Sequence, residues 1–377
     1  MKRISIVVLI LCGCLLPGGA WSQPLTCKLP TSWSEFHRKN MHRQNPCEAV
    51  LNVHNVGKLT LKWGYAAGNY VDSSPAVANG VVYVGSEDSN VYALNASSGA
   101  KLWSYATSMG GVHSSPAVAN GVVYVGSEDS DVYALNAKTG AKLWAFRTGY
   151  FVYSSPAVAN GVVYIGSLDY AVYALNASTG AKLWSYITGS FVFSSPAVVN
   201  GVVYVGSEDY NVYALDAKTG AKLWSYTTGS YVDSSPAVAN GVVYVGGGYN
   251  VYALNAKTGA KLWSYATGDF VDSSPAVANG VVYVGSRDNH VYALNAKTGA
   301  KLWSYTTGLH VFSSPAVANG VVYVGSDDGN VYALNARTGA KLWSYATTNS
   351  VYSSPAVVNG VVYVGSEGYN VYAFGLK

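Results

Sequence analysis

Short apolar runs separated by turn-forming residues follow one another along most of the chain. The first four of these runs, which we name A to D in chain order, are Ser73–Ala78, Val81–Gly85, Val91–Asn95 and Lys101–Tyr105. Asn79-Gly80 separates runs A and B, and Asn-Gly is the strongest two-residue signal for a β-hairpin. The pattern therefore predicts four consecutive antiparallel strands.

This four-run unit recurs eight times at a nearly constant period. Its Ser-Ser-Pro-Ala-Val segment begins at Ser73, Ser114, Ser154, Ser194, Ser234, Ser273, Ser313 and Ser353, which gives spacings of 41, 40, 40, 40, 39, 40 and 40 residues. A period of about forty residues with four strands in each repeat is typical of a β-propeller, where each repeat forms one blade. We therefore predict an all-β fold, an eight-bladed propeller of four-stranded antiparallel blades over residues 58–377.

A solenoid is the competing architecture for such a repeat. Pro75 and its equivalents lie within run A, and proline suits an edge strand such as the innermost strand of a blade, because it has no N–H to donate. The two ends of the repeat array also complement each other. The last unit, Ser353–Phe374, has no run D, whereas Leu59–Trp63 is an isolated run D before the first unit. We expect this N-terminal strand to complete the last blade and close the ring.

The segment joining runs C and D carries a family resemblance. Ala214–Trp224, with the sequence Ala-Leu-Asp-Ala-Lys-Thr-Gly-Ala-Lys-Leu-Trp, resembles the tryptophan-docking motif of pyrroloquinoline-quinone (PQQ) dehydrogenases and their relatives. Near-copies recur across residues 59–377, with Asn in place of Asp216. The resemblance implies that one tryptophan of each blade packs against the next blade, and Gly140 and its equivalents leave room for the ring. These structural tryptophans are Trp63, Trp103, Trp144, Trp184, Trp224, Trp263, Trp303 and Trp343.

The N-terminus has the features of an export signal. Two basic residues precede the apolar segment Ile4–Leu16, and Ala20–Ser22 is a suitable cleavage site. We therefore assign residues 1–22 to a signal peptide and expect a periplasmic or extracellular protein. The alternative is lipoprotein processing at Cys14, which lies in a lipobox-like sequence and would attach the chain to the outer membrane.

Residues 23–57 lie outside the repeat, and we expect them to form an irregular arm packed on the propeller. Cys27 and Cys47 remain in the mature chain, and an oxidising compartment favours a disulfide bond between them. Two free thiols are the alternative.

The distribution of charged residues along the chain bears on whether the propeller can bind nucleic acid. Residues 1–63 hold eight Lys/Arg and two Asp/Glu, a net charge of +6, whereas the remainder holds fifteen and seventeen, a net charge of −2. The propeller therefore lacks the basic stripe that nucleic acid requires, and we expect no nucleic-acid partner.

Recognisable catalytic chemistry is missing from the sequence. The chain has no Gly-x-Ser-x-Gly, His-Glu-x-x-His or Cys-x-x-Cys motif. It also lacks the adjacent cysteine pair of familiar alcohol-oxidising PQQ enzymes, and Arg147, Arg287 and Arg337 lie in no recognisable site. The acidic turn Ser86–Asn90 lacks the spacing of a calcium loop, and Asp and Asn in turns commonly bond their own backbone. We therefore expect no enzyme activity, no cofactor and no bound metal.

Differences between the near-identical units concentrate at the B–C turn and at the D–A connection before each Ser-Ser. In an up-and-down blade these two connections emerge on the same face, whereas the A–B and C–D turns emerge on the other. One face is therefore varied and the other constant, and loops on a rigid scaffold commonly carry function.

The residue before each Ser-Ser should ring the mouth of the central channel on the varied face, with exposed aromatic side chains beside it. The candidate binding residues are Asp72, His113, Phe151, Tyr153, Phe191, Phe193, Asp233, Asp272, Phe312 and Tyr352. Asp233 and Asp272 should form an acidic side opposite the aromatic arc Phe151–Phe193, where like charges raise each other's pKa or recruit a cation.

We predict an exported, monomeric binding or scaffold propeller that takes a protein or carbohydrate ligand at this mouth. Two alternative functions are a subunit like the propeller lipoprotein of the outer-membrane β-barrel assembly machine, and a PQQ-dependent dehydrogenase. A third alternative is structural: the aromatic side chains plug the channel.

Overall fold

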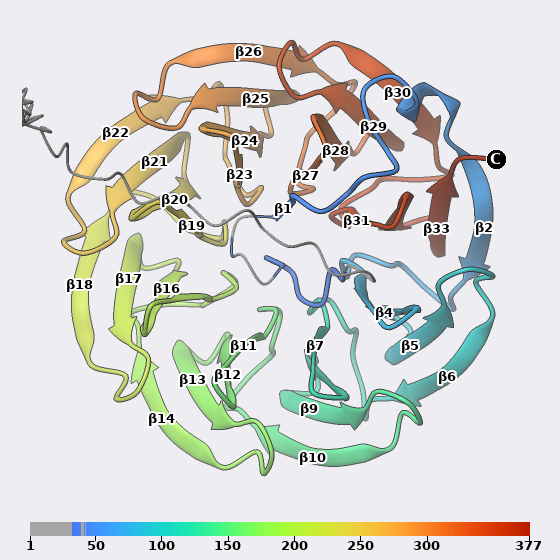
Figure 1. The fold of residues 1–377 in the computed structure, drawn as a ribbon. Coiled ribbons are helices and arrows are strands. Elements are labelled where there is room, and N and C mark those ends of the chain that lie inside the picture. The colour runs from blue at the N-terminus through green and yellow to red at the C-terminus, as the bar shows by residue number, and fades with distance from the viewer. Residues whose placement is uncertain (1–31, 39–40, 42) are drawn as a thin grey trace, which may run out of the picture.

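The computed structural model describes residues 32–38, 41 and 43–377, and it arranges eight antiparallel sheets around a central axis (Figure 1). Each sheet contains one blade of four antiparallel strands, A to D from the axis to the outer wall, and the predicted eight-bladed propeller is confirmed. The four strands are consecutive in seven blades, and in the last blade the N-terminal strand supplies strand D. The innermost strands are β3 (Ala76–Ala78), β7 (Ala117–Ala119), β11 (Ala157–Ala159), β15 (Ala197–Val199), β19 (Ala237–Ala239), β23 (Ala276–Ala278), β27 (Ala316–Ala318) and β31 (Ala356–Val358).

The remaining strands follow in the same order around the ring. The B strands are β4 (Val81–Gly85), β8 (Val122–Gly126), β12 (Val162–Gly166), β16 (Val202–Gly206), β20 (Val242–Gly247), β24 (Val281–Gly285), β28 (Val321–Gly325) and β32 (Val361–Ser366). The C strands are β5 (Asn90–Asn95), β9 (Asp131–Asn136), β13 (Ala171–Asn176), β17 (Asn211–Asp216), β21 (Asn250–Asn255), β25 (His290–Asn295), β29 (Asn330–Asn335) and β33 (Asn370–Gly375). The outer D strands are β6 (Lys101–Ala106), β10 (Lys142–Arg147), β14 (Lys182–Ile187), β18 (Lys222–Thr227), β22 (Lys261–Ala266), β26 (Lys301–Thr306), β30 (Lys341–Ala346) and β2 (Thr60–Ala66).

The hairpin between strands A and B has the geometry that its Asn-Gly pair predicts. Asn79 and Gly80 have φ angles of 51° and 77°, and a type I′ turn requires positive φ at both central residues. Strand A itself is shorter than predicted, because Ser73–Pro75 stand outside the ladder. Pro75 has no N–H, and the two serines bond the neighbouring blade instead.

These paired serines join the blades into a ring. The N–H of Ser74 donates to Oγ of Ser115 at 2.9 Å, and eight such bonds run from blade to blade and return from Ser354 to Ser74. Oγ of Ser73 also accepts the N–H of Gly85 at 3.0 Å. Both serine positions are buried in every blade, so the motif replaces ladder bonds that strand A cannot make.

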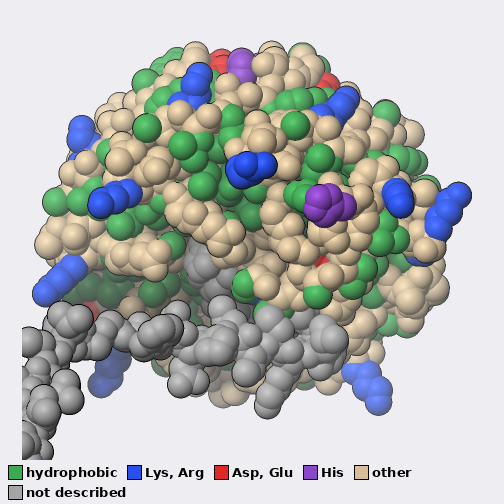
Figure 2. All heavy atoms as spheres, turned by 45° about the horizontal axis from the view of Figure 1, so that its top comes forward, with side chains coloured by type: hydrophobic (Ala, Val, Ile, Leu, Met, Phe, Trp, Pro, Cys, Tyr) green, Lys and Arg blue, Asp and Glu red, His purple; other side chains and the backbone are tan. Residues whose placement is uncertain are grey.

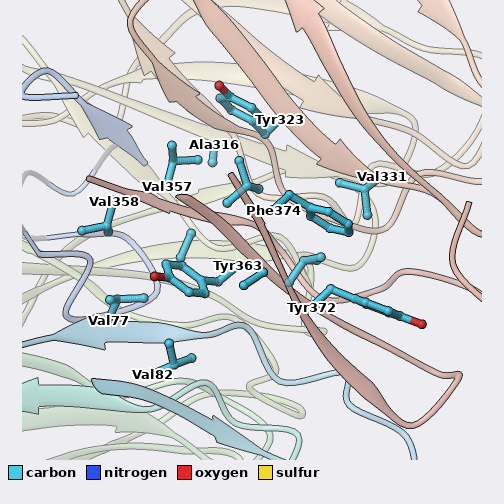
Figure 3. Close-up of a cluster of buried hydrophobic side chains, with 14 of the residues drawn as sticks. Val77, Val82, Ala316, Tyr323, Val331, Val357, Val358, Tyr363, Tyr372 and Phe374 are labelled. Carbon is cyan, nitrogen blue, oxygen red and sulfur yellow. The ribbon is translucent and has the colours of Figure 1, made fainter. Parts of the chain in front are cut away.

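The N-terminal strand closes the ring as predicted. β2 pairs antiparallel with β33, with Leu61 opposite Phe374, and the sheet order is β2-β33-β32-β31. Phe374 is fully buried in a hydrophobic cluster that also contains Val77, Tyr363 and Tyr372 (Figure 3). Because Val77 belongs to the first blade, side-chain packing as well as backbone pairing joins the two ends of the propeller.

One tryptophan of each outer strand lies between two blades. Nε1 of Trp103 donates to the carbonyl of Ala137 at 3.0 Å, and its ring lies against Gly140, where a Cβ would approach the ring to 2.7 Å. The same arrangement, with an exposed fraction of 8–9%, holds for Trp63, Trp103, Trp144, Trp184, Trp224, Trp263 and Trp303. Trp343 is only partly buried and donates to the carbonyl of Leu59 at 3.1 Å. It differs because the N-terminal segment, rather than a C–D turn, lies next to it.

The N-terminal arm enters the central channel, which the sequence did not predict (Figure 1). Trp33 forms a bridge with Val77, and β1 (Gln44–Asn45) pairs parallel with β27. Arg43 is fully buried, donates to the carbonyl of Pro315 at 3.0 Å, and lies over the ring of Phe36. Burial lowers the pKa of Arg43 to about 9. The arm contacts the strand A residues that lead to the A–B turns, so it lies toward the constant face of the propeller.

Beyond the channel, the arm continues through the short 3-10 helix η1 (Val56–Lys58) to β2. Cys47 takes part in a disulfide bond, whereas its predicted partner Cys27 lies outside the described residues, as do Cys14 and the predicted signal peptide. Within the described part of the chain, no helix combines the length and apolarity needed to cross a membrane. On the side of the molecule drawn in Figure 2, most Lys and Arg side chains stand apart from one another.

Candidate binding site at the channel mouth

The mouth opposite the arm is formed by the D–A connections and the B–C turns. A valine anchors each connection: Val112 is fully buried and donates its N–H to the carbonyl of Ser86 at 3.0 Å. It packs against Gly85, where a Cβ would come within 2.3 Å of the valine carbonyl. Because side chains alternate along an extended segment, the residues on either side of this valine face the mouth and its rim.

All ten predicted binding residues lie on this face, and each is partly exposed. The predicted aromatic arc is continuous, since the ring centroids of Tyr153 and Phe193 are 5.5 Å apart and Phe151 and Phe191 lie 6.4 and 6.2 Å from them, respectively. Phe312 and Tyr352, 5.0 Å apart, form a second group. The mouth therefore carries two aromatic sectors.

A collar of aromatic pairs surrounds this inner ring. Each pair joins a tyrosine to the aromatic residue that lies just before the anchoring valine, with centroids 4.4–5.3 Å apart: Tyr150–Phe151, Tyr170–Phe191, Tyr210–Tyr231, Tyr249–Phe270 and Tyr369–Tyr70. Six tyrosines of the collar are 42–50% exposed: Tyr150, Tyr170, Tyr210, Tyr231, Tyr249 and Tyr369. Aromatic surface is thus available to a partner over much of the varied face.

His113 lies among three carboxylates at the first two blades. Its Nε2 is 3.3 Å from Oε1 of Glu87 and 3.2 Å from Oε1 of Glu128, and its Nδ1 is 3.7 Å from Oδ2 of Asp72. Tyr153 donates its hydroxyl to Glu128 at 2.5 Å, and the Tyr153 ring lies 4.7 Å from the imidazole. Burial, followed by the charges of neighbouring carboxylates, raises the pKa of Asp72 to about 8.

Only one of the two carboxylates on the predicted acidic side lacks a basic partner. Asp233 and Asp272 do lie close enough for their charges to interact, but Nε of Arg287 is 2.5 Å from Oδ2 of Asp272. The guanidinium also lies over the rings of Phe270 and Phe312, at 5.3 and 5.0 Å. Arg287, which the sequence placed in no recognisable site, therefore belongs to the mouth and neutralises one of the two carboxylates.

Asp233 makes the stability of the protein depend on pH. Burial, followed by the charges of Asp272 and Glu208, raises the pKa of Asp233 to about 7, whereas an Asp in an unfolded chain titrates near 3.9. Between these values the folded state binds more protons than the unfolded state, so this group lowers the free energy of unfolding as the pH rises from about 4 to about 7. We expect the Asp233→Asn variant to show a smaller fall in the free energy of unfolding over this pH range, by on the order of 2 kcal/mol.

Urea denaturation across this pH range measures the free energy of unfolding, with Asp131→Asn as control. A fall of the same size in wild type and Asp233→Asn would contradict the prediction.

Sequence reasoning missed a second ring of charged residues, at the first position of the B–C turns. They are Glu87, Glu128, Glu208, Arg287, Asp327 and Glu367. The expectation that turn acids bond their own backbone holds for the next residue, Asp88, whose carboxylate accepts the N–H of Gly68 and Asn90 and the hydroxyl of Tyr92. Glu87 faces the mouth instead. The signal was available, because this position varies between units whereas the aspartate that follows it recurs.

These charges limit what the mouth can hold. PQQ is a planar quinone with three carboxylates, so its binding requires nearby cations. Among the described residues at the mouth, most charged side chains are carboxylates, and Arg287 is bonded to Asp272. The basic member of this ring of charged residues, Arg287, is thus already engaged by Asp272 and is not available to a carboxylate of PQQ without breaking that ion pair.

The repeats of this chain match a known protein family. The family model described as "Outer membrane protein assembly factor BamB" matches residues 38–152, 151–236, 229–315 and 308–377. The chain belongs to this family. The BamB family thus accounts for the PQQ-like repeat, and the resemblance drawn from the tryptophan-docking motif is confirmed.

Solved structures of two kinds share the fold of this BamB-family chain. BamB from Moraxella catarrhalis superposes with a TM-score of 0.74 at 21% identity, covering 84% of this chain and 100% of that one. A europium-containing methanol dehydrogenase superposes with a TM-score of 0.79 at 16% identity, covering 93% and 99%. Quinoprotein alcohol dehydrogenase PedE from Pseudomonas putida is 31% identical over 123 residues, which are 27% of this chain and 20% of that protein. Quinoprotein ethanol dehydrogenase from P. putida is 30% identical over 93 residues, 15% of its length, so the chain spans a fifth or less of these curated relatives.

Proposed function

We propose that this protein is an exported, non-catalytic binding or scaffold propeller that holds a protein or glycan partner on its varied face. The observation that carries the proposal is the aromatic collar around the mouth, with six tyrosines that are 42–50% exposed. Clustered exposed aromatic rings are characteristic of surfaces that bind proteins or sugars.

The backbone of the collar supports a role in binding. Tyr170, Tyr210 and Tyr369 have φ angles of 74°, 72° and 64°, a conformation that is unfavourable for a bulky side chain by roughly 1–2 kcal/mol. Gly329 occupies the same position in another blade without that strain. Each of the three tyrosine rings contacts an aromatic ring of the neighbouring connection and still leaves 42–45% of the residue exposed. The strained turns therefore present aromatic surface that a partner can contact.

Apolar and charged side chains lie next to one another in one cavity of the mouth. A cavity between the loops of the second and third blades is lined by Met109, Glu128, Arg147 and Phe151, and Met109 is 75% exposed. Its lining combines Phe151 of the aromatic arc with Glu128, which contacts His113. A partner with adjacent apolar and basic groups, such as an amphipathic peptide or an amino sugar, complements this arrangement.

The test compares two double variants in capture of partners from the cell envelope of the native host. We expect Phe151→Ala with Phe193→Ala to reduce capture at least about tenfold, because aromatic anchors commonly contribute most of the binding free energy. Lys142→Ala with Lys182→Ala, on the outer strands of the same region, is the matched control and should capture normally. Loss with the lysine pair and retention with the aromatic pair would place the partner on the outer wall and end the proposal.

Family membership favours a second candidate, a subunit of the outer-membrane β-barrel assembly machine, since the BamB model matches nearly the whole propeller. The same capture experiment separates the two candidates, because components of that machine would then be the partners recovered. The dehydrogenase alternative requires PQQ binding, which calorimetry with PQQ and calcium measures directly.

A further inference from the structure

The cluster around His113 differs from the rest of the mouth in its donor atoms. One oxygen of Asp72, one oxygen of Glu87 and one ring nitrogen of His113 lie within 4.8 Å of one another. Ligand atoms bound at 2.0–2.2 Å to a four-coordinate zinc ion lie roughly 3.3–3.6 Å apart. Small side-chain rotations are therefore enough to bring the three donors onto one ion.

A further carboxylate, that of Glu128, contacts the imidazole and is itself held in place. Glu128 lies 3.2 Å from Nε2 of His113, and its own carboxylate is fixed by the hydroxyl of Tyr153 at 2.5 Å and the N–H of Gly111 at 2.6 Å. Histidine ligands of metals usually have such a carboxylate partner, which sets the ring orientation and raises the basicity of the ligating nitrogen. Glu128 thus serves as a positioning residue. Asp72 lies 3.7 Å from Nδ1 of His113, whereas Glu87 lies 3.3 Å from Nε2, so ligation through Nδ1 requires the Glu87 side chain to turn toward Asp72.

The cluster also lacks a fixed positive charge. Across the mouth, Asp272 is paired with Arg287. Of the residues that the structure describes, no lysine or arginine forms an ion pair with Asp72, Glu87 or Glu128. Oδ1 of Asp72 is buried without a hydrogen-bond partner, which is costly for a carboxylate unless a cation or proton reaches it.

We propose that Asp72, Glu87 and His113 form a binding site for one divalent transition-metal ion, with Zn²⁺ as the best match. A mixed nitrogen and oxygen set suits Zn²⁺, whereas Ca²⁺ takes six to eight oxygen ligands. Three protein ligands leave a coordination position open to water or to a donor atom of a bound partner. Metal binding at this site depends on its own donor atoms and not on the proposed partner, so the two proposals can be tested independently.

The test titrates Zn²⁺ into the metal-stripped full chain by calorimetry, with metal content measured by mass spectrometry. We expect one Zn²⁺ per chain, a rise in melting temperature, and a loss of affinity of at least about tenfold in His113→Ala. His310→Ala, which removes another histidine of the same mouth, is the matched control and should bind as wild type does. Co²⁺ provides an independent signal, because a nitrogen-coordinated Co²⁺ ion changes its visible spectrum in wild type and not in His113→Ala.

Each other outcome would overturn the site. Equal affinity in wild type and His113→Ala would exclude the imidazole as a ligand, and an equal loss in His310→Ala would indicate unspecific binding to the mouth. Binding of Ca²⁺ but not Zn²⁺ would assign the carboxylates to a different kind of ion. Size-exclusion chromatography confirms that the variants remain folded, so failure to bind is not confused with unfolding.

Discussion

Replacing Trp184 with alanine should lower the free energy of unfolding by about 3–5 kcal/mol. The ring is 9% exposed, packs against Gly220 of the next blade, and donates Nε1–H to the carbonyl of Ala217 at 3.0 Å. Its removal leaves a cavity between two blades and an acceptor without its donor. Equilibrium denaturation measures the change.

Leu183→Ala is the matched control for this prediction, because Leu183 precedes Trp184 on the same strand and is 51% exposed. It should cost less than about 0.5 kcal/mol. Trp343→Ala should cost less than Trp184→Ala, since Trp343 is only partly buried. Similar losses in Leu183→Ala and Trp184→Ala would mean that the tryptophan does not pack between blades.

Deleting residues 59–66 should open the ring. β33 would then lose its partner β2 and present an unpaired edge, while it stays paired with β32 on its other side. Such unpaired edges recruit strands from other chains. We expect dimers and larger aggregates at micromolar concentration, together with a large fall in melting temperature. Size-exclusion chromatography with light scattering measures the assembly state.

A peptide of residues 59–66 added in trans tests the cause of this effect. It should pair with β33 and restore the monomer, whereas a peptide in which Trp63 is replaced by proline should not, because proline removes a ladder N–H and the packed ring. A deletion variant that stays monomeric with unchanged melting would show that closure does not depend on this strand.

The propeller could be predicted from the sequence because the residues that determine the blade structure recur in each repeat. Asn79-Gly80 requires a tight hairpin, Pro75 requires an edge, and Trp103 with Gly140 requires a packed blade boundary, each of them many times over. The channel-filling arm left no such signal. Trp33 and Arg43 bind backbone groups of the inner strands, and these groups are the same in every blade, so no residue pattern marks where the arm docks.

The candidate site was predicted in part for a related reason. Asp72 and the other residues before each Ser-Ser face the mouth because a buried valine fixes their alternation, and this is visible in the sequence. Glu87 was hidden by its neighbour Asp88, which caps the turn as acidic turn residues commonly do. Arg287 was overlooked because its partner Asp272 lies fifteen residues away, on a different connection of the same blade.

The pairing of β2 with β33 also sets the order of events during synthesis. The paired residues Thr60 and Gly375 are 315 positions apart, and at about 5–20 residues per second a ribosome needs roughly 15–60 s to make the intervening chain. During that interval the first strand has no native partner, and seven near-identical blades compete for it. The ring can close only when β33 is available, so the N-terminal strand stays without its native partner at least until residues 370–375 have been made.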